Sequence, residues 1–283
     1  MKNLLIRTAT GLVFITAVVA SLVCYESNSA LFYLLFLFFT VVGTYELVRM
    51  SRNIGMEANL SLSLLLSMTL FSIPPFMFVL PAYFFWHVIV IGIVVLLLLG
   101  VIVMASELFR ERPNPIGNIA LSFLPLFWVA VPFTIIGFLL GIGENKVALA
   151  IFIIIWLSDT LAYCSGRLFG KHKLFERVSP NKTIEGFVIS LCLTVAIVTS
   201  FHWIPFMQVQ AFSSPWHWTG FALTVVLFAT LGDLVESLFK RSCSVKDSGK
   251  VLPGHGGVLD RFDSALLAIP VASIYWIICA GIR

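Results

Sequence analysis

Long runs of hydrophobic residues, separated by short polar segments, follow one another along the whole chain. An α-helix of ~20 residues crosses the ~30 Å hydrocarbon core of a bilayer and satisfies its backbone polar groups internally. The pattern therefore predicts an all-α fold, a polytopic integral membrane helical bundle with nine spans. The predicted spans are 4–24, 30–50, 60–80, 84–105, 117–141, 147–169, 184–204, 217–239 and 264–282.

Composition agrees with this fold class. Hydrophobic residues make up 59% of the chain and charged residues only 11%, whereas a soluble domain carries about 25% charged residues. The five cysteines are scattered without a Cys-x-x-Cys pair, and they indicate neither a disulfide framework nor a zinc site. The net charge of +4 is small. We expect the chain to lie in a lipid bilayer and to have no nucleic-acid partner.

The positive charges indicate how the chain is oriented. With nine spans, sixteen of the eighteen Lys and Arg residues fall on the side of the N-terminus, and only Lys146 and Arg283 fall on the other side. Lys and Arg accumulate in cytoplasmic loops. We therefore predict a multi-pass protein of the cytoplasmic (inner) membrane, with the N-terminus inside and the C-terminus outside.

Polar residues are distributed unevenly within what we predict to be a single membrane domain, 1–283. Residues 1–145 have no long charged loop and are expected to be mainly scaffold helices. Residues 146–283 contain two long, charged loops with Gly and Pro, 167–183 and 240–263. This half is predicted to be catalytic, with both loops on the cytoplasmic side, so the active site faces the cytoplasm.

The N-terminal part contains two acid–base pairs at i,i+3 spacing. They are Glu46 with Arg49, and Glu107 with Arg110. Residues three apart are neighbours on a helix surface. Both pairs are therefore interpreted as ion pairs at helix ends, without a role in the site.

The eighth predicted span ends with polar residues on one helix face. At about 100° per residue, Asp233, Glu236, Ser237 and Lys240 lie within about 100° of arc. Carboxylates in a membrane segment are costly, usually face the bundle interior or a wet cavity, and mark function. For Glu236, an ion pair with Lys240 at i,i+4 explains the pattern equally well. Asp233 lies about two turns deeper than Lys240 and is the stronger functional candidate.

The segment after this span combines glycines, carboxylates and basic residues. Three glycines around His255 let the backbone approach a ligand closely and direct N–H groups toward it. Asp260 and Asp263, at i and i+3, open the ninth helix on one face. Carboxylates without a Cys or His cluster suit Mg²⁺, and Lys or Arg side chains suit phosphate oxygens. Together they favour phosphoryl or nucleotidyl transfer.

A second polar cluster belongs to the sixth span and its loop. Asp159 shares a helix face with Gly166 and Gly170, and these glycines also fit a stripe of small residues for close helix packing. In the loop, Lys182 is placed at the membrane face, where it is available to a phosphate. Thr183 suits the cap of the following helix. The cluster therefore has both a functional and a packing interpretation.

These residues resemble the motif of the phosphatidate cytidylyltransferases, or CDP-diacylglycerol synthases. That motif runs from Ser-x-apolar-Lys-Arg through Lys-Asp and His-Gly-Gly to Asp-Arg-x-Asp, and residues 237–263 follow it without departure. Gly232-Asp233 and the upstream patterns that begin at Asp159, Gly166 and Ser179 match as well. The resemblance covers about residues 150–270. Its central residues are Ser237, Phe239, Lys240, Arg241, Lys246, Asp247, Gly249, Leu252, Pro253, His255, Gly256, Gly257, Val258, Asp260, Arg261, Phe262 and Asp263.

The resemblance implies an enzyme of phospholipid biosynthesis, a nucleotidyltransferase that converts CTP and phosphatidate (phosphatidic acid) to CDP-diacylglycerol and pyrophosphate. It also implies Mg²⁺, with a monovalent cation such as K⁺ beside it, and a homodimer. The implied catalytic residues are Asp233, Lys240, Arg241, Lys246, Asp260 and Asp263, and the metal ligands among them are Asp233, Asp260 and Asp263. The implied substrate-binding residues are Asp159, Lys182, Ser237, Asp247, His255, Gly256 and Gly257.

Two other functions fit part of the pattern. A transporter also places carboxylates within the membrane, but it predicts inverted repeats and broken helices in both halves, whereas the polar residues here crowd into one half. A CDP-alcohol phosphotransferase would carry Asp-x-x-Asp-Gly, but Asp263 is followed by Ser264. Release of pyrophosphate from CTP in the presence of phosphatidate would distinguish the three.

Overall fold

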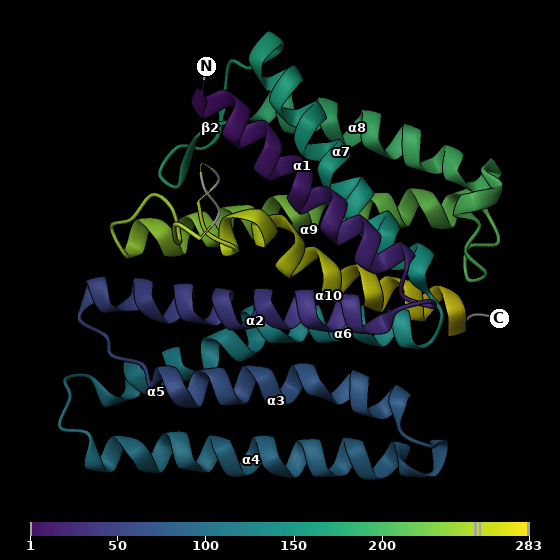
Figure 1. Ribbon diagram of the computed structural model, residues 1–283. Helices are drawn as coiled ribbons and strands as arrows, with labels where there is room; N and C mark the ends of the chain where they lie inside the picture. The colour runs from purple at the N-terminus through teal and green to yellow at the C-terminus, as the bar shows by residue number, and fades with distance from the viewer. Residues whose placement is uncertain (1, 252–253, 255, 282–283) are drawn as a thin grey trace. The chain divides into compact units, whose positions relative to one another are not determined.

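A computed structural model describes residues 2–251, 254 and 256–281 of the chain, and most of them are helical (Figure 1). Within these residues, eight helical segments are long and apolar enough to cross a membrane, and they coincide with the last eight predicted spans. The first predicted span coincides with helix α1 (Lys2–Val23). The eight segments are Ser29–Ile54, Leu60–Val79, Ala82–Phe109, Pro115–Gly141, Asn145–Phe169, Ile184–Trp203, Pro215–Ser242 and Leu259–Gly281. The predicted polytopic helical membrane fold is confirmed.

The chain folds as two compact units, and the first comprises Met1–Gly143 and Lys240–Phe262. α2, α3 and α4 lie side by side, and α6 packs on α3 (Figure 1). The helices after α1 are α2 (Ser29–Ser51), α3 (Leu60–Val79), α4 (Phe85–Phe109), α5 (Pro115–Pro125) and α6 (Val131–Gly141), with a π-helical turn at Leu126–Ala130 and 3₁₀ turns at Arg52–Ile54 and Ala82–Phe84. Pro132 lacks the N–H that a regular helix would use at this point, which explains the π-helical turn before it.

The second unit comprises Glu144–Phe239 and Asp263–Arg283. Its antiparallel hairpin pairs Lys173 with Thr183 and Phe175 with Ser179. Its elements are α7 (Asn145–Phe169), β1 (Lys173–Phe175), β2 (Ser179–Thr183), α8 (Ile184–Thr199), 3₁₀ turns at Ser200–Trp203 and Pro205–Met207, and the larger parts of α9 (Pro215–Ser242) and α10 (Leu259–Gly281). α9 and α10 therefore contribute residues to both units.

Aromatic rings form the core of the first unit around the start of α10. Phe262 is 2% exposed, and its ring centroid lies 4.9 Å from that of Phe133, 5.0 Å from Phe39 and 5.4 Å from Phe14. Edge-to-face aromatic pairs at such distances add about 0.5–1.5 kcal/mol each beyond the burial of their area. These contacts fix the start of α10 onto the N-terminal helices.

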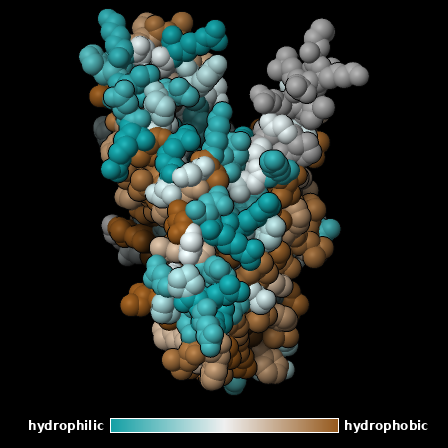
Figure 2. Space-filling view, turned by 90° about the vertical axis from the view of Figure 1, so that its left-hand side faces the viewer, coloured by the Kyte–Doolittle hydropathy of each residue, from teal (hydrophilic) through white to brown (hydrophobic). Residues whose placement is uncertain are grey.

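Much of the protein's surface is apolar, as expected for contact with lipid. α4 shows this most clearly, because only Gly92, Gly100, Val103 and Glu107 of this helix are buried. Leu97 is 66% exposed. The space-filling view shows broad hydrophobic areas interrupted by hydrophilic patches (Figure 2). In water such patches would favour aggregation, whereas in a bilayer they meet acyl chains.

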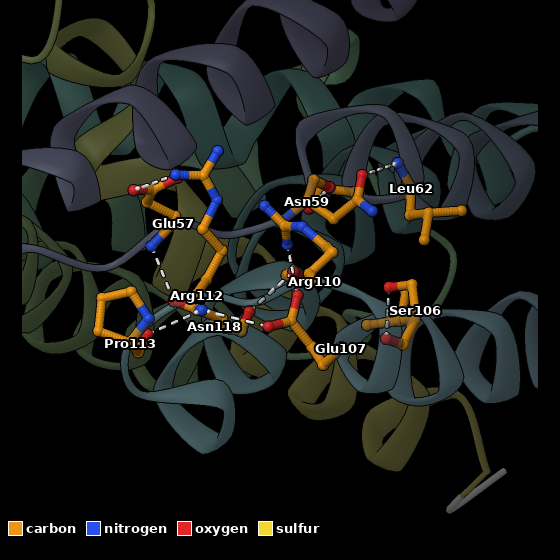
Figure 3. Close-up of polar contacts among 12 residues, drawn as sticks. Glu57, Asn59, Leu62, Ser106, Glu107, Arg110, Arg112, Pro113 and Asn118 are labelled. Carbon is orange, nitrogen blue, oxygen red and sulfur yellow. Dashed lines mark hydrogen bonds and ion pairs between the residues drawn. The ribbon is translucent and has the colours of Figure 1, made fainter.

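Polar side chains join helix ends within the first unit (Figure 3). The fully buried Asn118 accepts the Glu57 N–H at 2.7 Å through Oδ1, and its Nδ2 donates to Glu107 Oε2 at 3.2 Å and to the Pro113 carbonyl at 3.1 Å. Glu107 also forms the predicted ion pair with Arg110. Because the buried amide has partners on both of its polar atoms, this network fixes the connector before α3 to α4 and α5.

The second predicted loop is shorter than its predicted bounds of 240–263. Lys240 and Arg241 belong to the last turn of α9, and Asp260 belongs to the first turn of α10. Basic residues are stabilised at a helix C-terminus and acidic residues at an N-terminus. These three charged residues are thus helix-terminal, whereas Lys246, Asp247 and Lys250 do lie between the two helices.

The first predicted loop, 167–183, is also more ordered than expected. α7 continues to Phe169, and the remainder forms the hairpin of β1 and β2. The segment does lie between two spans, and the sequence did not indicate its strands, because two strands of three and five residues are too short to give a clear alternation of apolar and polar positions.

Candidate active site

A cavity of about 460 Å³ opens in the second unit between α7, α8, α9 and the hairpin. Its charged lining residues include Asp159 from α7, Lys182 from β2 and Asp233 from α9. Tyr163 and Phe187 contribute to the less polar part of its wall. A cavity that has charged groups beside apolar ones can receive a molecule with an ionic part and a lipophilic part.

Small residues allow α7 and α8 to pack closely at this cavity. A Cβ atom on Gly186 would lie 2.9 Å from Gly166 Cα and 3.0 Å from the Ala162 carbonyl oxygen. Thr183 Oγ1 accepts the Gly186 N–H at 3.2 Å and caps α8. The packing stripe and the helix cap predicted from the sequence are both confirmed. Since Asp159 also lines the cavity, its helix combines a packing role with access to the site.

An ion pair between Lys182 and Asp233 lies in the cavity. Lys182 Nζ contacts Asp233 Oδ2, and Asp233 Oδ1 accepts a hydrogen bond from Ser237 Oγ at 3.2 Å. The two charged side chains are 29% and 21% exposed, so a ligand in the cavity can reach both. Four predicted site residues of the second unit are thus close to one another: Lys182, Asp233, Ser237 and Asp159.

Glu185 fixes the hairpin on which Lys182 stands. Its carboxylate accepts the N–H of Lys171 at 3.0 Å and that of His172 at 3.1 Å, and it pairs with His172 Nδ1 at 2.5 Å. The motif contained Glu185, but the sequence indicated no role for it. Its partners are two backbone amides and a ring nitrogen 13 to 14 positions earlier, which side-chain patterns do not reveal.

Gly232 allows α10 to approach the backbone of α9 within the second unit. A Cβ atom at this position would lie 2.6 Å from the carbonyl oxygen of Asp263 and 3.2 Å from that of Ser264. Asp263 Oδ1 accepts the Ser264 N–H at 2.7 Å. Asp233 follows Gly232 directly, so two of the three predicted metal ligands stand at this helix crossing.

In the first unit, Lys240 and Asp260 form a buried ion pair. Lys240 Nζ donates to Asp260 Oδ1 at 2.8 Å, and the two side chains are 11% and 7% exposed. Asp260 Oδ2 accepts the Gly257 N–H at 2.8 Å and both the N–H and the hydroxyl of Ser248 at 2.9 Å. Removal of one partner of such a pair costs about 3–5 kcal/mol. These bonds therefore order the loop between α9 and α10.

The remaining predicted residues of the first unit differ in exposure. Gly256 has a φ of +82°, which glycine adopts readily, and a Cβ there would lie 2.6 Å from Asp260 Oδ2. His255 lies outside the described residues. The exposed members of the set are Arg241, Lys246 and Asp247. Exposed basic side chains near a glycine-rich loop are available to an anionic ligand.

The predicted metal ligands fit Mg²⁺ in part. Mg²⁺ keeps several waters and is usually bound by one or two carboxylates and substrate phosphates, which Asp233 and Asp263 could provide at the crossing of α9 and α10. Asp260 has less capacity, because its Oδ2 already accepts three hydrogen bonds. Among the residues that the structure describes, no three His, Cys, Asp or Glu side chains gather closely enough to hold a metal ion. The three-ligand site stays a prediction.

Glu46 of α2 contacts the loop before α10, which the sequence did not predict. The expected partner, Arg49, has its guanidinium carbon 6.0 Å from the centroid of the Tyr45 ring. The Glu46 carboxylate accepts the N–H groups of Val258 and Leu259, which lie 212 and 213 positions later in the chain. The only signal in the sequence was a carboxylate within an apolar helix.

Comparison with known proteins gives one family. The model of the cytidylyltransferase family matches residues 5–279. The phosphatidate cytidylyltransferase of Staphylococcus aureus (strain COL) is 48% identical over 124 residues, which cover 44% of this chain and 46% of that protein. Those of Staphylococcus haemolyticus and Staphylococcus saprophyticus are 47% and 48% identical over 127 and 126 residues, with the same coverage. The matched part of the chain thus spans about half the length of these curated relatives.

Proposed function

The chain belongs to the cytidylyltransferase family, and on that premise we propose that it transfers the cytidylyl group of CTP to phosphatidate, giving CDP-diacylglycerol and pyrophosphate. One observation supports this function above others. The cavity of the second unit places Lys182 and Asp233 beside apolar side chains, between helices that are long and apolar enough to cross a membrane. Phosphatidate likewise combines an ionic part, its phosphate, with a lipophilic part, its acyl chains.

The chemistry needs little proton transfer. The phosphate monoester of phosphatidate is already an anion at neutral pH, and one of its oxygens attacks the α-phosphorus of CTP in line. A phosphorus–oxygen bond to the lipid phosphate forms, and the bond to the β-phosphate oxygen breaks. The electron pair leaves with pyrophosphate. Catalysis of such a step consists mostly of positioning and charge neutralisation.

In this proposal the basic side chains bind phosphate groups and the carboxylates bind the metal ion. Lys182 binds a phosphate in the cavity, and the exposed Lys246 and Arg241 neutralise charge on the triphosphate. Within the second unit, Asp233 and Asp263 would hold Mg²⁺, whereas Asp260, the third ligand that the resemblance implies, belongs to the first unit. When bound, this ion would neutralise negative charge on the phosphate oxygens. A monovalent cation such as K⁺ beside it belongs to the same proposal.

Turnover of the two substrates tests the function. Purified protein in detergent, given CTP, phosphatidate and Mg²⁺, is expected to release pyrophosphate and to form CDP-diacylglycerol in equal amounts. Diacylglycerol, which lacks the phosphate nucleophile, serves as the control and should give neither product. Pyrophosphate release that does not depend on phosphatidate would contradict the proposal.

We further propose that the site faces the cytoplasm, which the distribution of Lys and Arg supports. A cysteine introduced at the exposed Glu176, in a variant without other exposed cysteines, should react with a membrane-impermeant thiol reagent only in inverted vesicles. A cysteine at Tyr83, 72% exposed and predicted on the other side, should react in intact cells. Labelling of the Glu176 variant in sealed cells would overturn the orientation. Cys243 is a poor probe, because it is buried and burial raises the pKa of its thiol.

The homodimer implied by the resemblance is also part of the proposal. The apolar surface of α4 supports association within the bilayer as well as contact with lipid. The molar mass of the protein in detergent, corrected for the bound detergent, measures this state.

A further inference from the structure

Glu46 is a buried carboxylate in the last third of α2, with three hydrogen-bond donors around it. It is 1% exposed. Its Oε1 accepts the Val258 N–H at 3.1 Å, and its Oε2 accepts the Leu259 N–H at 3.0 Å. The Ser248 hydroxyl oxygen lies 3.1 Å from Oε2 and shares its one proton between Glu46 and Asp260. All these residues belong to the first unit. Glu46 therefore holds the N-terminal end of α10 and the loop before it through both carboxylate oxygens.

Two glycines of the same loop are explained by this carboxylate. A Cβ on Gly249 would collide with Glu46 Oε1, and a Cβ on Gly257 would lie 2.5 Å from both Glu46 oxygens. Neither glycine has a positive φ, unlike Gly254 and Gly256. Their backbone conformation is therefore open to other residues. A side chain is excluded at Gly249 by Glu46 and at Gly257 by Ser248 Oγ together with Glu46.

Ser248 connects Glu46 to the predicted catalytic ion pair. Its hydroxyl oxygen lies 3.1 Å from Glu46 Oε2 and 2.9 Å from Asp260 Oδ2, and Ser248 is 6% exposed. Asp260 in turn accepts the bond from Lys240 at 2.8 Å. A displacement of the Glu46 carboxylate would thus move Ser248 and, through it, the acceptor geometry of Asp260.

We propose that Glu46 is a positioning residue for the site: it fixes the glycine-rich loop onto α2 and so orients Asp260 and Lys240. The consequence for catalysis rests on the proposed function, whereas the fixation of the loop does not. The contacts of Glu46 are to Ser248, Val258 and Leu259, and the proposal gives it no contact with a substrate. Its effect on turnover is exerted through the loop.

Glu46→Gln tests the fixation of the loop. Glutamine keeps one acceptor oxygen and replaces the other by an NH₂ group, so at least one of the N–H groups of Val258 and Leu259 faces a donor. Hydrogen exchange of the metal-free protein in detergent is expected to become about tenfold faster in residues 256–262, since one protecting bond is lost at about 1.4 kcal/mol. Peptides from the hairpin, 171–183, should be unchanged.

Glu107→Gln is the matched control. Glu107 is also a buried carboxylate of the first unit, bonded to Arg110 and Asn118 rather than to the loop. Its substitution should leave exchange in 256–262 unchanged. Equal acceleration in both variants, or none in Glu46→Gln, would overturn the proposal.

Kinetics separate positioning from a purely structural role. Glu46→Gln is expected to lower kcat about 10- to 100-fold, because small displacements of catalytic groups have effects of that size, with little change in KM for phosphatidate. A folded variant with a faster-exchanging loop and an unchanged kcat would remove the catalytic part of the proposal. If wild-type protein does not use CTP and phosphatidate, the proposed function fails while the exchange result still decides the fixation of the loop.

A second pair of variants approaches the same contact from the loop. Gly249→Ala should accelerate exchange in 256–262, because its methyl group displaces the Glu46 carboxylate. In a Glu46→Ala background the carboxylate is absent, and adding Gly249→Ala should cause no further change. Such non-additivity is the mark of a direct contact. Additive effects would contradict the assignment of Gly249 to this contact. Gly249→Ala in the wild-type background keeps Glu46 and remains informative if Glu46→Gln fails to fold: unchanged exchange in 256–262 would then overturn the proposal.

Discussion

Asp233→Asn is expected to lower kcat/KM for CTP by about 10³-fold or more, because it removes a charge from the place where anionic phosphates and Mg²⁺ would meet. The substitution hardly changes the volume of the side chain. It leaves the Ser237 hydroxyl with an acceptor, since asparagine retains one oxygen. Lys182 loses its counter-charge, so phosphate binding by Lys182 should persist while turnover is lost. Initial rates of pyrophosphate release over a range of CTP concentrations, at saturating Mg²⁺ and phosphatidate, measure the effect.

A carboxylate outside the cavity provides the control for this variant. Glu176→Gln changes an exposed residue between β1 and β2, and it should retain activity close to that of the wild type. Circular dichroism and thermal unfolding in detergent should be the same for both variants. If Asp233→Asn retains more than about a tenth of the wild-type rate, which corresponds to a barrier change below about 1.4 kcal/mol, Asp233 does not bind a required metal.

The spans could be predicted because hydropathy depends only on local sequence. The prediction ended α9 too early and began α10 too late, since Lys240, Arg241 and Asp260 are charged yet stand in terminal helical turns. Hydropathy alone does not distinguish a charge that complements a helix end from a charge in a loop. The assignment of Lys240–Phe262 to the first unit could not be predicted, because it depends on which distant helices this segment packs against.

In the candidate site, too, residues in a local motif could be predicted, whereas contacts between segments far apart in the chain could not. The motif identified Asp233, Lys182 and Asp260, and the structure places the first two in one ion pair. It did not identify Glu46, whose partners are more than two hundred positions away. Gly257 illustrates the consequence. The sequence suggested that this glycine makes room for substrate, and in the structure the Glu46 carboxylate and Ser248 occupy that room.

UTP is expected to be used about 10⁴-fold less efficiently than CTP, measured as kcat/KM. Basic residues and Mg²⁺ bind the triphosphate of any nucleotide, so a preference for cytosine requires hydrogen bonds to its exocyclic amine and ring edge. Uracil presents an acceptor where cytosine presents that amine, and a site group paired with cytosine would be left unpaired. For the same reason dCTP, which has the same base, should be used better than UTP.

Asn181 is one side chain of the second unit that can contribute to this preference. It lines the cavity beside Lys182 and has both donor and acceptor atoms. Asn181→Leu should lower kcat/KM for CTP about ten- to a hundredfold, the effect of one lost hydrogen bond, and should affect UTP less.

Gly256→Ala is the contrasting variant, because its methyl group would strain a φ of +82° and approach Asp260. It should reduce the use of both nucleotides equally. Use of UTP within tenfold of CTP by the wild type would mean that the base is not recognised here.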